Sequence, residues 1–439
     1  MSDIVALLHC LTPYLSNTTM RQLKQVVFAV LCIPDRVTMR GIARWTERGG
    51  SYRTIQRWYH TPLAWAMLLW TVIQSHLLNP ESEYLLAGDE VVISKAGKTT
   101  PGCGRFYSSV AQRPISSVSF MAVSLIDVQA RRSYPLQVEQ REPPVPAEKP
   151  VNPPPKRKRG RPKGSQNHVK PVPTLTPDLT LLQRMMTAIT ARIAPLTVKH
   201  IVLDGHFGNY PATYAVRECG LHIISKLRHD AALYLPYTGP KPPRGPTPRY
   251  GEKLKYHQLP AEALCHSVVE GDYRLDTYQL TVFHPSFPDA LNVVIVVKTH
   301  LKTGKRGQVV LFSTALDLTA HQIVDYYALR FQIEFTFRDA KQYWGLDDFM
   351  NVKPVAVTNA VNLAFFMVNL SAVMLKPYRH AHPDFSVLDL KAQCRARRYL
   401  DETIKMLPDP PGDDLVSRIW RRLTAFGGIR VRPLDRFAA

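Results

Sequence analysis

The first 80 residues carry apolar side chains at helical spacing, so the sequence predicts a helical domain over residues 1–80. Within it, Thr38 to Trp45 has the pattern of an amphipathic helix, a pair of glycines supplies a turn, and Ser51 can cap a second helix. That second helix carries Arg53 and Arg57. The spacing is typical of a helix-turn-helix whose second helix contacts DNA, and a helical hairpin that only packs is the alternative.

The pattern changes at Tyr84, where apolar runs rich in Val, Ser, Tyr and Phe predict β-strands. A helix begins later with Thr176 as its cap and Pro177 as its first residue, and a short helix closed by Gly220 follows. The strand candidates read YLLAGDEVVIS, SSVSFMAVSLIDV, SYPLQVEQ, VKHIVLDGHFGN, LHIISKLR, YRLDTYQLTVF and LNVVIVVKTH. This order of strands and helices predicts a mixed α/β fold.

The overall charge indicates the class of partner. The formal net charge is +21 and the pI is about 9.8, so the protein should attract a polyanion, and nucleic acid is the commonest one. A membrane surface is the rival, but the most apolar window, Leu63 to Leu78, is short for a span and predicts a buried helix. The six scattered cysteines and the absence of an export signal in the first residues lead us to expect a cytoplasmic protein.

A basic, proline-flanked segment, KRKRGRPKGS, interrupts the α/β pattern. Six of the eight residues from Lys156 to Lys163 are cationic, and the prolines keep the flanks extended. Its centre resembles an AT-hook, in which Arg159 and Arg161, with Lys163 beside them, enter an A·T-rich minor groove. We therefore predict a DNA-binding loop over residues 141–175, and a nonspecific basic loop is the alternative.

Two aspartates stand at or near the ends of apolar strands. Burying Asp89 without a partner would cost several kcal/mol, and a bound metal would meet that need. Asp204 ends a strand before a glycine-containing turn. A lone aspartate in such a position is more often a plain turn residue. Glu90 is the neighbour of Asp89, but successive strand side chains point to opposite faces, so we assign the site to Asp89.

The segment from Asp325 to Leu346, DYYALRFQIEFTFRDAKQYWGL, has the length and composition of one helix. At about 100° per residue, two separate arcs emerge on it. An apolar arc has the character of a core-facing stripe, and a polar arc could be a solvated charged face. The polar arc consists of Tyr327, Arg330, Glu334 and Lys341.

The spacing of these four residues resembles the Y-(2)-R-(3)-E-(6)-K signature of the insertion-sequence DDE transposases, in the branch called the IS-four family. The contexts GDEVVISKAGK and IVLDGHFGN look like the first and second acid motifs of that family. The resemblance covers roughly residues 80 to 380. It implies a ribonuclease-H-like core in which Asp89, Asp204 and Glu334 hold two divalent metal ions and carry the catalysis.

The chemistry implied by this resemblance suits the residue types. Phosphodiester cleavage is helped by two hard cations about 4 Å apart, which stabilise the attacking and leaving oxygens. Carboxylates prefer Mg²⁺ or Mn²⁺ as such cations. Arg330 and Lys341 could then contact phosphates near the cleavage site, and Tyr327 could donate its hydroxyl to another.

The resemblance also divides the chain. The ribonuclease-H-like core is expected over residues 81–227 and 306–380, with a β-rich insertion domain at 228–305 and a basic C-terminal region at 381–439. In relatives a tryptophan of the insertion helps to hold a flipped base during hairpin formation. This sequence has no tryptophan between Asp204 and Glu334, so a hairpin intermediate is in doubt, although Tyr or Phe could stack a base.

The sequence therefore predicts a DNA transposase that binds element ends, cuts by two-metal hydrolysis and joins the 3′ ends to target DNA. Its expected partners are double-stranded DNA, namely element ends and target, and a second copy of the chain when paired ends are bound. No membrane partner is expected, and the protein should be cytoplasmic and associated with the nucleoid. The alternatives are a catalytically inactive DNA-binding regulator and a plain metal-dependent DNA nuclease.

Overall fold

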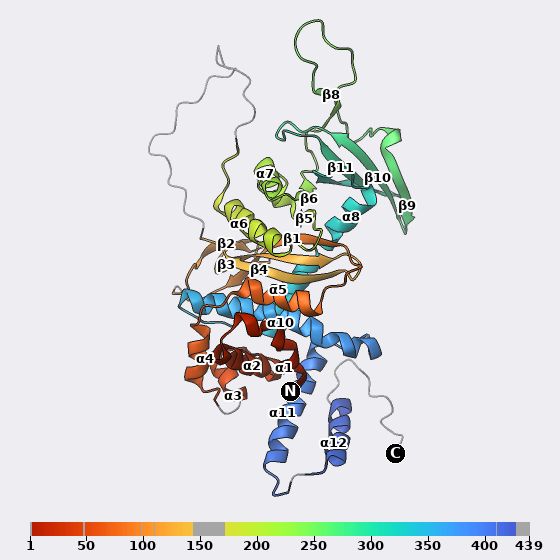
Figure 1. Cartoon of the computed structure of the whole chain (residues 1–439). Coiled ribbons are helices and arrows are strands. Elements are labelled where there is room, and N and C mark those ends of the chain that lie inside the picture. The colour runs from red at the N-terminus through yellow and green to blue at the C-terminus, as the bar shows by residue number, and fades with distance from the viewer. Residues whose placement is uncertain are drawn as a thin grey trace.

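A large mixed β-sheet runs through the centre of the molecule (Figure 1). The computed structural model describes residues 2–46, 49–97, 99–108, 110–143, 172–409 and 411–426. The strands of the large sheet are β1 (Tyr84–Ser94), β2 (Gly104–Ser108), β3 (Arg113–Asp127), β4 (Arg132–Gln140), β5 (His200–Leu203), β6 (His222–Leu227), β9 (Leu264–Glu270), β10 (Tyr273–Val282), β11 (Leu291–His300) and β12 (Arg306–Ser313). A separate pair is formed by β7 (Tyr234–Pro236) and β8 (Tyr250–Lys253).

The central strands have the ribonuclease-H-like arrangement. Their order is β4-β3-β1-β5-β6, in which β1 is antiparallel to β3 and parallel to β5, and β5 is parallel to β6. Strands β1, β3 and β4 are antiparallel neighbours, and β2, which lies between β1 and β3 in sequence, pairs with the start of β3. The parallel strands β5 and β6 follow the helices α6 and α7. The predicted mixed α/β, ribonuclease-H-like fold is confirmed.

The β-rich insertion continues the central sheet. Strand β12 pairs antiparallel with β6, and β11, β10 and β9 follow outward in that order. The strands predicted at YRLDTYQLTVF and LNVVIVVKTH are β10 and β11. Because the hydrogen-bonded ladder is continuous, the insertion is attached to the core through backbone pairing as well as through its linkers.

Helices cover both faces of the sheet (Figure 1). Leu182, Met185 and Ile189 of α6 are buried, and Thr176 caps that helix as predicted. On the opposite face α8 buries its apolar side against a cluster that includes Leu85. The helices of the sheet layers are α5 (Trp65–His76), α6 (Pro177–Arg192), α7 (Tyr210–Glu218), α8 (Ala320–Leu329), α9 (Gln332–Trp344) and α10 (Pro354–Ala381), with the short η2 (Gly205–Phe207) and η3 (Ala261–Ala263).

The N-terminal helices form a layer beneath the sheet (Figure 1). Both predicted caps of the helix-turn-helix-like pair are present, since Thr38 accepts a hydrogen bond from Gly41 N–H and Ser51 accepts one from Thr54 N–H. The remaining helices are α1 (Ser2–Leu8), η1 (His9–Tyr14), α2 (Asn17–Cys32), α3 (Met39–Trp45), α4 (Tyr52–Tyr59), α11 (Val387–Lys405) and α12 (Asp413–Phe426).

Helix α10 joins these helices to the sheet. It is long and apolar enough to cross a membrane, but 78% of its most apolar window is buried inside the protein. Its Asn359 Nδ2 donates to the carbonyls of Tyr59 and Thr61, 2.8 Å each, and its Oδ1 accepts from Trp65 Nε1 at 2.7 Å. This buried amide satisfies backbone groups at the end of α4 and so fixes α4 on α10.

Candidate active site

The sheet register places two aspartates beside each other. Strands β1 and β5 are parallel neighbours, and Gly88 lies opposite Leu203, so Asp89 and Asp204 are the next residues on the two strands. Both side chains are half-buried. Asp89 Oδ1 accepts the backbone N–H of Glu90 at 2.8 Å.

Asp204 is held by the turn that follows β5. Its Oδ1 accepts the N–H of His206 at 3.1 Å, and its carbonyl accepts the hydroxyl of Ser225 at 2.7 Å. Gly208 lies so close to β6 that a Cβ there would stand 2.2 Å from the carbonyl oxygen of Lys226. Only glycine permits this approach, which presses the turn carrying Asp204 onto the sheet.

The helix that carries the third carboxylate is interrupted. The prediction of one helix from Asp325 to Leu346 is wrong at its middle, because α8 ends at Leu329 and α9 begins at Gln332. At the break, Ile333 N–H and Glu334 N–H bond to carbonyls three residues earlier, 3.1 Å each. This tighter turn interrupts the α-helical hydrogen-bond pattern without any proline or glycine.

Arg330 stands at this break and connects two of the three acids. Its guanidinium donates to Asp89 Oδ2 at 2.8 Å and to Glu334 Oε1 at 2.9 Å. Burial raises the pKa of Asp89 to about 7, Arg330 opposes that shift, and the charges of Asp204 and Glu334 add to it. Asp89 thus lies near two other carboxylates, and Arg330 supplies only part of the neutralising charge.

The other two residues of the predicted polar arc have different surroundings. Tyr327 is half-buried near Arg330 and Asp204, and burial raises the pKa of its hydroxyl. Lys341 donates to the carbonyl of Val92 on β1 at 3.1 Å. Tyr327 therefore lies with the acids, whereas Lys341 ties α9 to the strand that carries Asp89.

The donor set suits a hard divalent cation, since Asp89, Asp204 and Glu334 offer only carboxylate oxygens. Burial is the main reason why the pKa of Asp89 is raised, and the charges of Asp204 and Glu334 add to the shift; a cation beside the three carboxylates would oppose both effects. In the part of the chain that the structure describes, no three His, Cys, Asp or Glu side chains are already grouped closely enough to hold a metal. The residue types fit such an ion chemically, and in this structure Glu334 Oε1 accepts a hydrogen bond from Arg330.

Glu90 faces away from these acids. It forms an ion pair with Arg141, which also donates to Asp178 Oδ1 at 2.9 Å and to Ser119 Oγ at 3.2 Å. Sequence reasoning missed Arg141, because neither its type nor its spacing distinguishes it from the other cations. The network fixes the start of the segment that leads into the basic loop.

Only some of the other residues predicted to contact DNA lie in the part of the chain that the structure describes. Arg53 and Arg57 are exposed on α4, whereas Ile55 and Trp58 face the core. The AT-hook-like residues lie outside the described residues; they are Arg159, Arg161 and Lys163.

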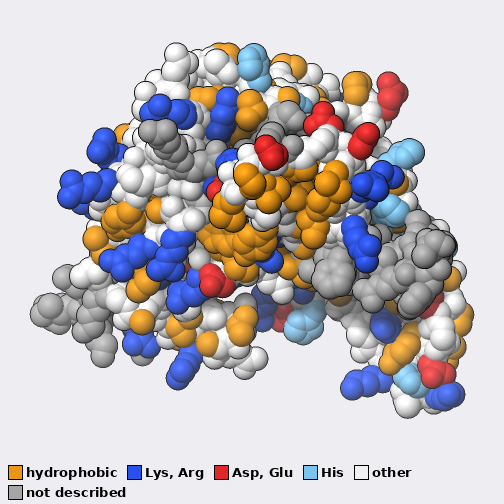
Figure 2. All heavy atoms as spheres, turned by 90° about the horizontal axis from the view of Figure 1, so that it is seen from below, with side chains coloured by type: hydrophobic (Ala, Val, Ile, Leu, Met, Phe, Trp, Pro, Cys, Tyr) orange, Lys and Arg blue, Asp and Glu red, His pale blue; other side chains and the backbone are white. Residues whose placement is uncertain are grey.

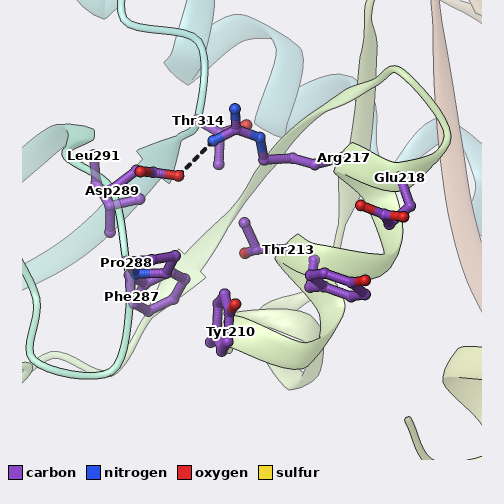
Figure 3. Close-up of a pocket in the computed structure, with 10 residues that line it drawn as sticks. Tyr210, Thr213, Arg217, Glu218, Phe287, Pro288, Asp289, Leu291 and Thr314 are labelled. Atoms are coloured by element: carbon purple, nitrogen blue, oxygen red, sulfur yellow. Dashed lines mark hydrogen bonds and ion pairs between the residues drawn. The ribbon is translucent and has the colours of Figure 1, made fainter. Parts of the chain in front are cut away.

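A pocket of about 160 Å³ lies elsewhere, between α7 and the segment before β11 (Figure 3). Arg217 and Asp289 form an ion pair across it at 2.7 Å. Tyr210, Thr213 and Phe287 line it, and none of the three predicted acids does. The ion pair joins the core to the insertion, so we interpret this pocket as part of their junction.

A comparison with protein families matches the model described as DDE superfamily endonuclease over residues 10–281, more than half of the chain. The chain belongs to this family. Its members are divalent-metal-dependent nucleases that act on DNA. The match includes Asp89 and Asp204 and ends before α9. A comparison with curated proteins gives no match.

Proposed function

We propose that this DDE endonuclease is a transposase of the IS-four type, which binds the ends of its element, cuts them and joins the 3′ ends to target DNA. The observation that carries the proposal is that Arg330 bridges Asp89 and Glu334. Arg330 belongs to a segment whose Tyr-Arg-Glu-Lys spacing resembles the signature of that family. An arginine on an ordinary surface helix would not need to pair both with a glutamate of its own helix and with a half-buried aspartate of the central sheet.

In this proposal Asp89, Asp204 and Glu334 would hold two Mg²⁺ or Mn²⁺ ions. When bound, such ions stabilise the attacking and leaving oxygens of a phosphodiester. With such ions bound, the charge of the carboxylates would be balanced without Arg330, whose guanidinium could then donate two parallel hydrogen bonds to two oxygens of a phosphate. Tyr327, beside it, can donate its hydroxyl to a second oxygen.

Lys341 has a different role in the same proposal. Its ammonium holds the backbone of β1 at Val92, so it positions the strand that carries Asp89. Its side chain is 34% exposed, which leaves room for a neighbouring phosphate. A DNA substrate further implies a cytoplasmic, nucleoid-associated protein, and simultaneous binding of two ends implies a homodimer.

The test is cleavage and joining of the element's terminal DNA in Mg²⁺ or Mn²⁺, with wild type compared with Glu334→Gln. We expect both reactions in wild type and neither in the variant, with DNA binding retained. Asp339→Asn is the matched control, since Asp339 lies on the same helix and pairs with Arg338. Cleavage without joining would indicate a plain nuclease instead.

A catalytically inactive DNA-binding regulator is the second candidate. Two observations favour it: the carboxylates of the described residues are not grouped for a metal, and Arg330 lies between two of them. Equal DNA binding by wild type and Glu334→Gln, with no cleavage by either protein in either metal, would establish this function and refute the transposase.

A further inference from the structure

A groove of about 510 Å³ separates the α3–α4 helix pair from the loop that joins α9 to α10. One wall is formed by the start of α3 and the exposed side of α4, and the other by the loop. Its chemistry is mixed, with cationic, amide and aromatic groups on the helix side and two exposed apolar side chains on the loop. Its lining includes Arg40 on the helix side and Met350, Val352 and Lys353 on the loop.

The loop is fixed at several points. Gly345 closes α9 with a φ of 76°, a conformation that other residues rarely adopt. Asp348 accepts the backbone N–H of Val37 at 2.8 Å, which ties the loop to the segment before α3. Lys95, next after β1, donates to the carbonyl of Phe349 at 2.7 Å and lies 3.5 Å from the centre of that ring.

These anchors hold two apolar side chains, Met350 and Val352, out of the protein. Phe349 is buried, with 5% of its surface exposed, whereas the next residue, Met350, is 79% exposed and Val352 is 59% exposed. A methionine held at the tip of an anchored loop loses little further backbone freedom when it contacts a partner. The loop is thus a preformed apolar projection beside a polar groove.

The charge around the groove favours an anion. Arg40 and Lys353 are exposed at its two walls, and Arg53 and Arg57 are exposed on the adjoining helix. Of the described lining residues, Asp348 is the acid, and it is paired with Arg36 at 3.2 Å. Figure 2 shows lysine and arginine side chains gathered at the left of the lower face, the side on which α3 and α4 lie in Figure 1.

Two elements, α9 and β1, run from the acids to the loop that lines the groove, and their lengths give the separation. Helix α9 runs from Glu334 to Trp344 before the loop, a rise of about 15 Å. Strand β1 spans about 20 Å from Asp89 to Lys95, which contacts the same loop. At about 3.4 Å per base pair, this separation corresponds to roughly four to six base pairs.

We infer that this groove binds duplex DNA about five base pairs from the scissile phosphate, with Arg40 and Lys353 on backbone phosphates and Met350 against a base step. Phosphate contacts from opposite walls would fix the register of the duplex. Apolar side chains such as methionine can enter between base steps and partly unstack them. The inference rests on the proposed binding of element ends and adds a second contact to the one predicted from the sequence for Arg53 and Arg57 of α4.

The first experiment uses full-length protein with Ca²⁺ in place of Mg²⁺ and a duplex that the wild type enriches from a random-sequence pool ending in a blunt terminus. Its affinity is measured by fluorescence anisotropy over a series of salt concentrations. For Arg40→Ala/Lys353→Ala we expect the slope of log K against log salt to fall by about 2 and the affinity to fall at least tenfold.

The matched control is Lys241→Ala/Arg244→Ala, which removes the same charge from an exposed loop at the opposite end of the molecule (Figure 1). An equal loss in this control would overturn the inference, because charge anywhere would then suffice. Failure to enrich any duplex would refute end binding itself and the groove with it. Enrichment with unchanged slope in the groove variant would refute the groove alone.

The second experiment places 2-aminopurine at successive positions counted from the blunt end of the enriched duplex. The blunt end represents the cleaved end of the element, so these positions are counted from the scissile phosphate. We expect the gain in fluorescence on binding, which reports unstacking, to peak about four to six pairs from the end and to disappear in Met350→Ala. Met406→Ala is the control, since Met406 is 78% exposed on another surface. A gain that survives Met350→Ala, or that peaks at another position, would overturn the assignment of Met350.

Discussion

Removing Arg330 should destabilise the protein in a way that depends on pH. The guanidinium lies 2.8 Å from Asp89 and 2.9 Å from Glu334, and the Arg330 and Asp89 side chains are only 16% and 17% exposed. Water therefore screens the Asp89 pair weakly. In EDTA, Arg330→Met leaves the carboxylate of Asp89 buried beside Asp204 and Glu334 without its counter-ion.

The size of the effect is limited by protonation. At an effective dielectric constant of about 20, the loss of one ion pair at about 4 Å would cost about 4 kcal/mol. Asp89 has a less costly response, because its pKa is already about 7 and it can take up a proton. Since each pKa unit corresponds to about 1.4 kcal/mol, protonation limits the added cost at about pH 8.5 to about 2 kcal/mol.

The direction in which stability changes with pH follows from the number of protons that the folded and unfolded states bind. A pKa raised in the folded state means that the folded protein holds a proton that the unfolded chain has lost, so stability from this group falls as pH rises toward 7. In wild type the fall ends near that value, and in Arg330→Met it continues above it. At about pH 5.5 Asp89 is protonated in both proteins, so the remaining cost is the loss of the hydrogen bonds of Arg330 and of its partly exposed pair with Glu334, about 1 kcal/mol.

The assay is urea unfolding of both proteins in EDTA at about pH 5.5 and about pH 8.5. The difference in free energy of unfolding should widen by up to about 2 kcal/mol at the higher pH. Arg338→Met is the control, because Arg338 lies on the same helix, is 54% exposed and should show no widening. A difference that is the same at both pH values would refute the electrostatic account of Arg330.

Three further perturbations test other parts of the structure. Gly208→Ala should abolish metal-dependent cleavage, because its Cβ would displace the turn that carries Asp204. Gly205→Ala should retain cleavage, since its Cβ would meet its nearest atom at an ordinary 3.6 Å. Equal activity of the two variants would contradict the packing argument. Asn359→Leu should lower the free energy of unfolding by about 3 kcal/mol, because backbone carbonyls at the end of α4 lose their donor. Thermal melts would measure this loss, with Thr358→Ala as a control at an exposed position of the same helix. Burial lowers the pKa of Lys391 to about 8, so the folded state binds fewer protons than the unfolded chain above that value, and stability from this group should rise between pH 8 and its ordinary pKa of 10.5. Urea midpoints across that range should lose this rise in Lys391→Met, and an unchanged rise would assign it to other groups.

The strands and helix caps could be predicted because their signals are local. The strand patterns around Asp89 and Asp204, and the Thr176 and Ser51 caps, depend on neighbouring residues and appear in the structure as expected. The pairing of β1 with β5 follows from the order of strands in such a fold. Both aspartates could therefore be expected at the same point of the sheet.

The break at Arg330 and the anchored loop after α9 could not be predicted in this way. The break contains no proline or glycine, and a periodic pattern of apolar residues runs through it unchanged. The contact of Lys95 with Phe349 joins residues more than 250 positions apart, and no local pattern records it. Such features depend on tertiary contacts that override helical periodicity.

The contacts of the loop after α9 connect the acids to the helices that are proposed to bind DNA. Helix α9 carries Glu334 at one end and leads at the other into a loop held by Lys95 from β1 and joined through Asp348 to the segment before α3. The N-terminal helices and the sheet also share one continuous apolar core. A duplex bound at α4 would therefore meet the acids at a distance set by the fold. In that case the position of the cut would follow from where α4 binds, and insertion of a residue into the loop after α9 should move the cut relative to the bound sequence.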